Sequence, residues 1–192
     1  MPITLYSPKK LRSPICLLDV PSAWKGCELV IGDIINRFKI KTDKALEFGV
    51  EYGYSTVVLS NFFKQVIGVD TFDGDQHTLH KNIEGFYEGI KDFLAPYKNI
   101  QLEKSSYQDY IKTKYMNAPF DLIHVDIVHT YQDTFNCGDW AMENATMVIF
   151  HDTESFPDVR RAVLDLSEKY SVEFYNYPHF YGLGILCHKS LS

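Results

Sequence analysis

Short apolar runs alternate with longer amphipathic stretches along most of the chain. Five of these runs have the length and composition of buried strands, and the apolar positions that follow each run recur at helical spacing. The strands are expected at 44–49, 65–70, 99–103, 120–126 and 146–150, and the helices at about 54–63, 78–95, 107–113, 131–142 and 158–169. The pattern also predicts an earlier helix at about 22–38, capped by Ser22, and two final strands at 171–175 and 181–187.

This alternation predicts an α/β fold with a doubly wound, mostly parallel seven-stranded sheet and a C-terminal antiparallel strand. Residues 1–20 are punctuated by proline and are expected to be irregular. We expect one compact domain, with residues 1–40 as an N-terminal segment and helix and residues 41–192 as the main unit. Right-handed crossovers then bring the carboxyl ends of the parallel strands to one edge of the sheet, where ligands bind in such folds.

Composition narrows the class of protein. The 192 residues are 45% hydrophobic, which is enough for a sizeable core. The net charge of −6 argues against a nucleic-acid partner, because phosphate binding needs clustered Lys and Arg. No segment approaches the length of a membrane span, and the four cysteines have no CxxC or zinc-ligand spacing. These features predict a reduced, cytoplasmic protein without a membrane partner.

Acidic and small residues gather where the predicted strands end. Gly49 and Gly53 follow Glu47 and allow a sharp turn that approaches a ligand closely, although a tight turn without a ligand is the alternative. Asp70 ends the next strand, where a carboxylate can accept both hydroxyls of a ribose, or it is simply a turn residue. The spacing therefore favours a nucleoside ligand.

Two further carboxylates end neighbouring strands. Asp126 and Asp152 are expected to face one cavity and can hold a divalent cation. His129 follows three residues after Asp126, within reach of the same place, and is a candidate general base. In the alternative interpretation, Asp126 caps the helix that begins near Thr130 and His129 lies on the surface.

Several segments together resemble a known family. They are Glu47–Ser55, Val69–His77, Asp121–Asp126, His129–Tyr131, Phe150–Thr153 and Val159–Val163. Over about residues 44–187 the chain resembles a bacterial class I methyltransferase family with a Rossmann-like fold. That family is similar to the metal-dependent O-methyltransferases that act on catechols and on macrolide sugars.

The resemblance implies S-adenosylmethionine as cofactor and a small-molecule acceptor. Residues 1–40 have two alternative roles, either covering the acceptor site or packing on a second copy in a homodimer. The residues that it places at the cofactor are Glu47, Gly49, Glu51, Tyr54, Ser55, Asp70, Thr71, Ser106 and Asp126. It implies metal ligands at Asp126, His151 and Asp152, with Mg, Mn or Fe as the metal, and a base at His129. The expected reaction is O-methylation of a small-molecule or sugar hydroxyl.

Two positions depart from the pattern of that family. His151 stands where the metal enzymes have an acid, and a histidine with two carboxylates suits iron better than magnesium. This favours an alternative, an oxygenase or hydroxylase on a methyltransferase-like fold. Val128 stands where relatives often carry an acid, which favours a catalytically inactive nucleoside-binding module.

Two further segments are candidates for the acceptor site. The polar residues 71–77 are expected to form a lid or a plain surface turn. The aromatic group Tyr175, Tyr177, His179, Phe180 and Tyr181 is expected to be an acceptor wall or core packing.

Overall fold

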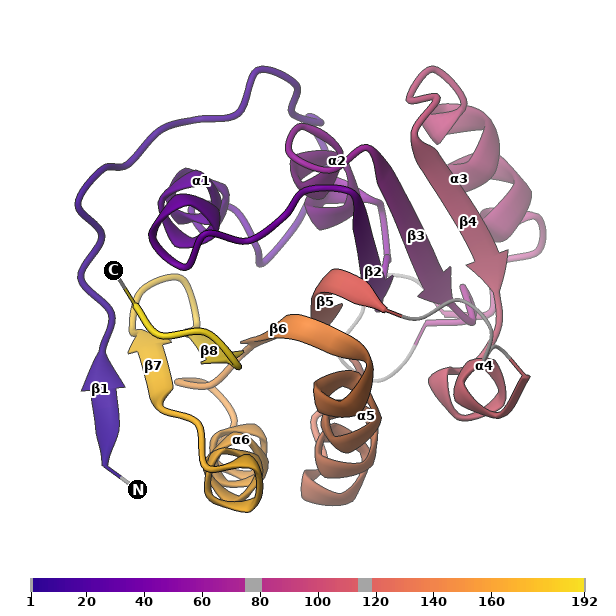
Figure 1. Cartoon of the computed structure of the whole chain (residues 1–192). Coiled ribbons are helices and arrows are strands. Elements are labelled where there is room, and N and C mark those ends of the chain that lie inside the picture. Colours follow the sequence, from indigo (N-terminus) through magenta and orange to yellow (C-terminus); the bar gives the residue numbers. More distant parts are fainter. Residues whose placement is uncertain (1, 75–80, 114–118, 192) are drawn as a thin grey trace.

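The computed structural model describes residues 2–74, 81–113 and 119–191. Within these ranges one sheet of eight strands runs in the order β1-β7-β8-β6-β5-β2-β3-β4 (Figure 1). The strands are β1 (Ile3–Leu5), β2 (Lys44–Phe48), β3 (Gln65–Asp70), β4 (Ile100–Lys104), β5 (Phe120–Val125), β6 (Ala145–His151), β7 (Phe174–Tyr177) and β8 (Leu183–Cys187). β8 is antiparallel to β6 and β7, and the other neighbours are parallel. The predicted doubly wound α/β fold is confirmed.

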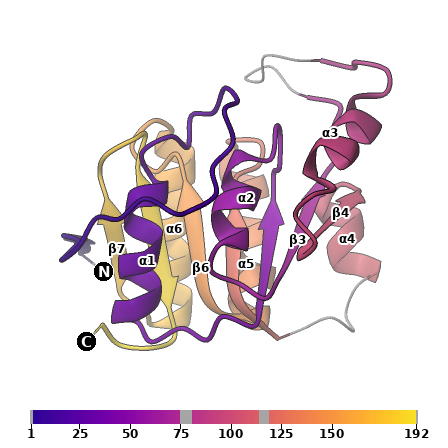
Figure 2. The ribbon, with the colours of Figure 1, turned by 90° about the horizontal axis from the view of Figure 1, so that it is seen from above.

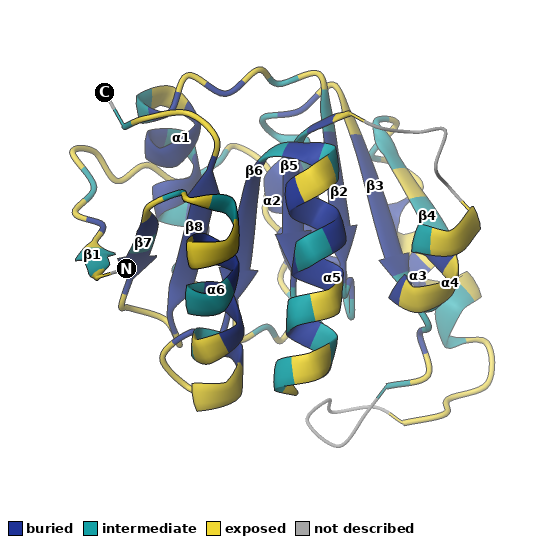
Figure 3. Cartoon of the chain, turned by 60° about the horizontal axis from the view of Figure 1, so that its bottom comes forward, coloured by how far each residue is buried: buried dark blue, intermediate teal, exposed yellow. Residues whose placement is uncertain are grey.

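Helices cover both faces of the sheet (Figures 1 and 2). They are α1 (Glu28–Arg37), α2 (Tyr54–Ser60), α3 (Phe86–Leu94), α4 (Tyr107–Thr113), α5 (Tyr131–Asn144) and α6 (Pro157–Tyr170). α1, α2 and α3 pack on one face and α4, α5 and α6 on the other, so each face has its own apolar cluster. The strands between the two edge strands are mostly buried, while the outer sides of the helices are exposed (Figure 3), which explains why these inner strands are nearly continuous apolar runs in the sequence.

The order of the strands reverses beside β2. The chain passes from β2 through α2 to β3 on one side, whereas β5 pairs with β2 on the other. A crevice forms at such a switch point, beyond the carboxyl ends of the strands. No helix in the described ranges combines the length and apolar character needed to cross a membrane.

The first helix starts later than the sequence predicts. It was expected from about residue 22, but α1 begins at Glu28 after a series of turns. Gly26 has φ +106°, which interrupts helical geometry. Ser22 does not cap α1, because its hydroxyl accepts a hydrogen bond from the backbone N–H of Trp24.

The remaining differences are local. Residues 3–5, expected to be irregular, form the eighth strand by pairing with β7. The helix expected over 78–95 is shorter, since α3 begins at Phe86 after Gly85 at φ +75°, and residues 78–80 lie outside the described ranges. β7 and β8 each begin two or three residues later than expected.

Candidate active site

A cavity of about 360 Å³ lies at the carboxyl ends of the central strands. Its volume is within the range of small-molecule pockets. The predicted site residues that line it are Gly49, Glu51, Asp70, Thr71, Ser106, Asp126, His129, His151 and Asp152. Tyr54 and Ser55 instead line a smaller adjoining cavity of about 40 Å³, and Glu47 is absent from both linings. Most of the dispersed candidates therefore share one hollow.

The glycine loop after β2 approaches the end of β5 closely. Gly49 has φ +93°, and a Cβ atom at this position would lie 1.7 Å from the backbone oxygen of Asp126. Gly53, at φ +82°, precedes α2, where a Cβ atom would lie 2.7 Å from Leu94. Only glycine fits the first of these positions without moving the backbone.

Asp70 fastens the glycine loop to the end of β3. Its Oδ2 accepts hydrogen bonds from the backbone N–H groups of Val50 at 2.8 Å and Glu51 at 2.9 Å. Its Oδ1 accepts from the backbone N–H of Phe72 at 2.7 Å. Each carboxylate oxygen has two lone pairs, so Oδ2 is fully used and Oδ1 can still accept one hydrogen bond from a ligand in the cavity.

Glu47 points into the core on the α1 and α2 side of the sheet. Its side chain is fully buried and accepts hydrogen bonds from Thr56 and from the imidazole of His124. Strand alternation causes this placement, because Leu46 and Phe48 occupy the opposite face.

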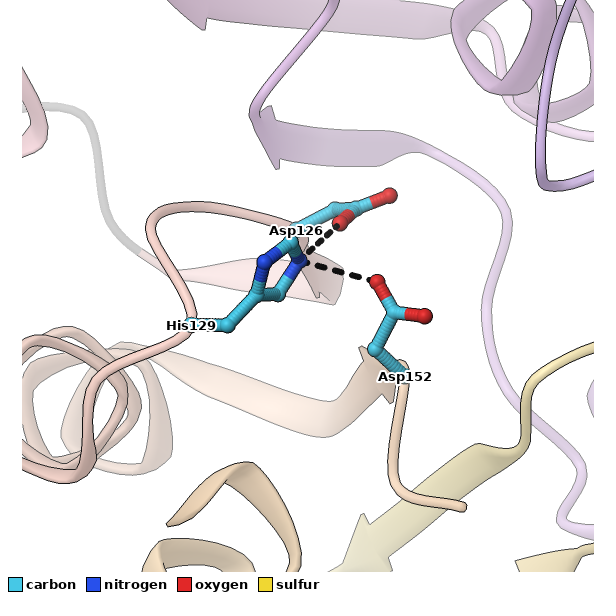
Figure 4. Close-up of side chains that lie close together, drawn as sticks. All are labelled: Asp126, His129 and Asp152. Carbon is cyan, nitrogen blue, oxygen red and sulfur yellow. Dashed lines mark ion pairs between the residues drawn. The ribbon is translucent and has the colours of Figure 1, made fainter. Parts of the chain in front are cut away.

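Asp126, His129 and Asp152 converge at the ends of β5 and β6 (Figure 4). His129 Nε2 lies 2.9 Å from Asp152 Oδ2 and 3.8 Å from Asp126 Oδ1. The imidazole also stacks on the ring of Phe156, with centroids 4.0 Å apart and planes 11° apart. The side chain of His129 is only 14% exposed, so the interpretation of this histidine as a surface residue is wrong.

The carboxylates and imidazoles of this cluster alter one another's proton affinities. Burial by itself would lower the pKa of His129, but hydrogen bonds and charges from Asp126 and Asp152 outweigh burial and raise it to about 9. Burial would raise the pKa of Asp126, yet the charge of His151 and hydrogen bonds from both histidines lower it. The pKa of Asp152 is also lowered, since hydrogen bonds from His129 and His151 exceed the effect of burial. At neutral pH the cluster therefore holds ionised carboxylates around a protonated His129.

His151 links the cluster to the turn between β7 and β8. Its Nδ1 lies 3.4 Å from Asp126 Oδ2 and 3.3 Å from Asp152 Oδ2. Its Nε2 donates to the backbone carbonyl of Phe180 at 3.1 Å. Burial would lower the pKa of His151, but the neighbouring Asp126 and Asp152 raise it.

Three side chains present ligand atoms that lie within 4.8 Å of one another: Asp126, His129 and Asp152. This set shares both carboxylates with the predicted metal ligands but has His129 in place of His151. Two carboxylates and an imidazole suit Mn or Fe better than Mg, which prefers oxygen ligands. The donor set thus fits a divalent transition metal.

The wall formed by α4 and α5 was not predicted in full. Tyr107 lines the cavity and its hydroxyl donates to Asp133 Oδ1 at 2.8 Å. Thr130 caps α5 by accepting from the backbone N–H of Asp133, so the alternative role of Asp126 as that cap is wrong. Tyr107 directly follows the predicted Ser106, and extending the search past the strand end would have found it. Ala23 also lines the cavity, and its sequence context carries no signal of this position.

The C-terminal aromatic group divides between core and rim. Tyr177 is 5% exposed and Tyr175 packs against the same apolar cluster. Phe180 and Tyr181 are 41% and 56% exposed, and the Tyr181 ring lies 6.3 Å from the His151 ring. The core interpretation thus holds for the first two tyrosines, and the turn residues lie beside the cluster. The expected lid at 71–77 falls partly outside the described ranges, since residues 75–80 are not described.

Comparison with known proteins identifies the family. The sequence profile of the family described as "Methyltransferase domain" matches residues 46–153, more than half of the chain. This chain belongs to that methyltransferase family. The match begins within β2 and ends just after Asp152, so it includes the glycine loop and both carboxylates of the cluster. A comparison with curated protein sequences finds no match.

Solved methyltransferase structures share the fold of this methyltransferase. The O-methyltransferase NovP is similar with a TM-score of 0.62 and 13% identity, over 81% of this chain and 75% of NovP. TomG from Streptomyces achromogenes, an O-methyltransferase of tomaymycin synthesis solved with S-adenosylmethionine, has a TM-score of 0.60 and 16% identity over 82% and 77% of the two chains. An O-methyltransferase from Bacillus cereus, in complex with S-adenosylhomocysteine, has a TM-score of 0.60 and 13% identity over 80% and 77%.

Proposed function

We propose that this methyltransferase moves a methyl group from S-adenosylmethionine to a hydroxyl oxygen of a small molecule. The observation that carries the proposal is the single cavity shared by the glycine loop, Asp70 and the Asp126–His129–Asp152 cluster. O-methyltransferases of the same fold, solved with the methyl donor or its product, support this assignment. The net charge of −6 supports a small molecule over a nucleic acid as acceptor.

The cavity has features that suit a positively charged nucleoside. The close approach of Gly49 to Asp126 allows the loop backbone to form the floor beneath the cofactor. Asp70 Oδ1 has one lone pair left to accept a ribose hydroxyl, and Tyr107 offers an aromatic wall. Glu51 and Asp70 also line the cavity, and their carboxylates favour a cation such as a sulfonium.

S-adenosylmethionine, when bound, supplies an electrophilic methyl group. The chain's own contribution is to hold the acceptor oxygen in line with that group, an ordering that can lower the barrier by several kcal/mol. We place the proton of the acceptor hydroxyl at His129 Nε2, which lies between Asp126 and Asp152. The two carboxylates stabilise the imidazolium that results.

A divalent cation is a second means of activating the hydroxyl. Asp126, Asp152 and one of the histidines would hold it, and a cation there would lower the pKa of a bound hydroxyl. The same cation would compete with the proton on His129 for the carboxylates. Chelation and readdition of Mn²⁺ during the assay below separate the two cases.

The rim beside the cluster supports an acceptor that carries a ring. Phe180 and Tyr181 are exposed at the turn between β7 and β8, and Val128, which directly precedes His129 in the sequence, is 43% exposed. Both φ angles in the turn are positive, at 54° and 69°. Strained backbone of this kind is often found at ligand sites. Phenols and sugars both carry a ring with a hydroxyl group and are therefore the acceptor classes that we propose.

The assay that tests the proposal is a mass-spectrometric screen with methyl-labelled S-adenosylmethionine against phenols, catechols and sugars. We expect a labelled product with the wild-type chain. His129→Gln should reduce its rate by about 100-fold or more, the usual contribution of a general base. His188→Gln is the matched control, because His188 bonds to the carbonyl of Met142 and does not line the cavity.

Absence of label from every acceptor class, with a chain that is folded, would contradict the proposal. Equal rates for the two histidine variants would remove His129 as the base while leaving methyl transfer intact. Acceptor oxidation without label transfer would instead support the oxygenase alternative, which the match to a methyltransferase family disfavours.

A further inference from the structure

A chain of hydrogen bonds is buried beneath the cavity. The indole Nε1–H of Trp24 donates to His124 Nε2 at 3.1 Å, and His124 Nδ1 lies 2.9 Å from Glu47 Oε1. Thr56 donates to the other carboxylate oxygen of Glu47. None of the four side chains is more than 2% exposed.

The direction of these bonds follows from their chemistry. An indole nitrogen can only donate, so Nε2 of His124 must be the acceptor and Nδ1 must carry the hydrogen. That hydrogen points at the carboxylate of Glu47, which accepts a second bond from Thr56. Each of the three hydrogen bonds in this network therefore joins one donor to one acceptor.

The network joins segments that are far apart in the sequence. Glu47 and His124 are register partners on β2 and β5, the strands at the switch point. Thr56 is in α2, just after the glycine loop, so its bond to Glu47 ties the two ends of that loop together. Trp24 belongs to the N-terminal segment before α1.

Each side chain of the network lies within two residues of a residue that lines one of the two cavities. Ala23 precedes Trp24, Gly49 follows Glu47 by two residues, and Asp126 follows His124 by two residues. Residues 21–24 also line the smaller cavity, opposite the glycine loop. The Trp24 ring lies 5.1 Å from the His124 ring and 6.5 Å from the ring of His151.

Packing alone does not explain why the buried positions 47 and 124 carry polar side chains. Glu47 and His124 are surrounded by the apolar cluster under α1 and α2, where burying a carboxylate costs several kcal/mol unless it is fully bonded. Apolar side chains of similar size stabilise such a position at least as well. The hydrogen bonds instead fix the relative positions of the segments that they join, because they require a defined distance and orientation between those segments.

We propose that Trp24 is a positioning residue for the cofactor cavity, holding the N-terminal segment against the glycine loop through His124 and Glu47. This inference rests on the proposed binding of S-adenosylmethionine and adds a wall that the family match does not include, since the match begins at residue 46. Loss of the indole N–H leaves His124 Nε2 without its donor and releases residues 21–24 from the cavity.

The test compares the same substitution at the two tryptophans. Trp24→Phe keeps an aromatic ring but removes the donor. Trp140→Phe is the matched control, because Trp140 is also buried but its indole N–H has no hydrogen-bond partner among the described residues, and it packs on the opposite face of the sheet. By calorimetry, we expect Trp24→Phe to weaken S-adenosylhomocysteine binding about tenfold, because the released residues 21–24 must be ordered again on binding. Trp140→Phe should stay within about twofold of the wild type.

A spectroscopic measurement keeps the test decisive if Trp24→Phe does not fold. The sequence has two tryptophans, so Trp24 is the sole indole fluorophore of Trp140→Phe. Its emission should change on saturation with S-adenosylhomocysteine. Equal affinity of the two variants, or an unchanged Trp24 emission while calorimetry shows binding, would overturn the inference. Absence of binding by wild type and Trp140→Phe alike would overturn the proposed function itself.

Discussion

The carboxylates of Asp126 and Asp152 are negatively charged and the imidazole of His129 is positively charged. Each charge stabilises the opposite charge beside it. A proton on His129 is stabilised by both carboxylates, and each carboxylate is stabilised by a histidine. The same proton must leave before His129 can accept another from a substrate. The activity of His129 as the base that we propose should therefore depend on pH.

We predict that kcat/KM of the metal-free enzyme rises with pH between 7 and 9. The pKa of about 9 leaves about one molecule in a hundred with a neutral His129 at pH 7, so the rate should increase about tenfold from pH 7 to 8, reach half of its maximum near pH 9 and level off above it. Initial rates with labelled S-adenosylmethionine across this range provide the measurement. A flat profile in a chelated sample would show that His129 is not the base, and a lower midpoint with Mn²⁺ would indicate a cation in the cluster.

At the residue scale, the sequence predicts which side chains meet but not which way each one faces. Asp126 and Asp152 could be placed together because parallel strand ends share an edge. Glu47 was predicted at the cofactor, whereas its carboxylate is bonded to His124 and Thr56 within the core. A glutamate and a histidine in facing strands could have signalled this pair, but the register of β2 and β5 is not visible in the sequence.

At the scale of elements, the backbone of the loop between β2 and α2 is the most tightly constrained part of the site. Its first glycine lies against the backbone of β5's end, and Asp70 from β3 accepts two of its N–H groups. The loop thus connects the three central strands of the site. Its geometry depends on the glycine at position 49, because a larger residue there would place a side chain in the space that the backbone of Asp126 occupies.

We predict opposite effects of alanine at two glycines. Gly49→Ala should lower the free energy of unfolding by more than about 2 kcal/mol, because φ is +93° and the new Cβ would collide with Asp126. Gly89→Ala, within α3 where no atom lies within 4 Å of the added Cβ, should raise it by about 0.5–1 kcal/mol. Urea unfolding of both variants gives the comparison. A Gly49→Ala protein as stable as the wild type would refute the close packing of this loop.

Helix and strand boundaries were predictable only where the chain itself marks them. Apolar spacing located α2, α4, α5 and α6 well, but the apolar residues before Glu28 continue the helical pattern although Gly26 interrupts the helix. Such turns are decided by contacts elsewhere: the Phe180 ring occupies the space beside Gly26, where a Cβ would lie 2.2 Å from it. The sequence gives no sign of that contact.

In the whole molecule, strand order brings the site together from the two halves of the chain. β2 and β3 supply the glycine loop and Asp70, while β5 and β6 supply the charged cluster. The alternation of strands and helices predicted this arrangement. The eighth strand was not predictable, because three residues that pair with the sheet edge leave no periodic signal.

Titration calorimetry with S-adenosylhomocysteine tests most directly whether these distant residues form one cofactor site. Wild-type protein should bind one molecule per chain, and Asp70→Ala should bind at least about tenfold more weakly, because the variant loses the acceptor for a ribose hydroxyl and for the N–H groups of Val50 and Glu51. A wild-type protein that is folded yet gives no heat of binding at high micromolar concentration would contradict the account.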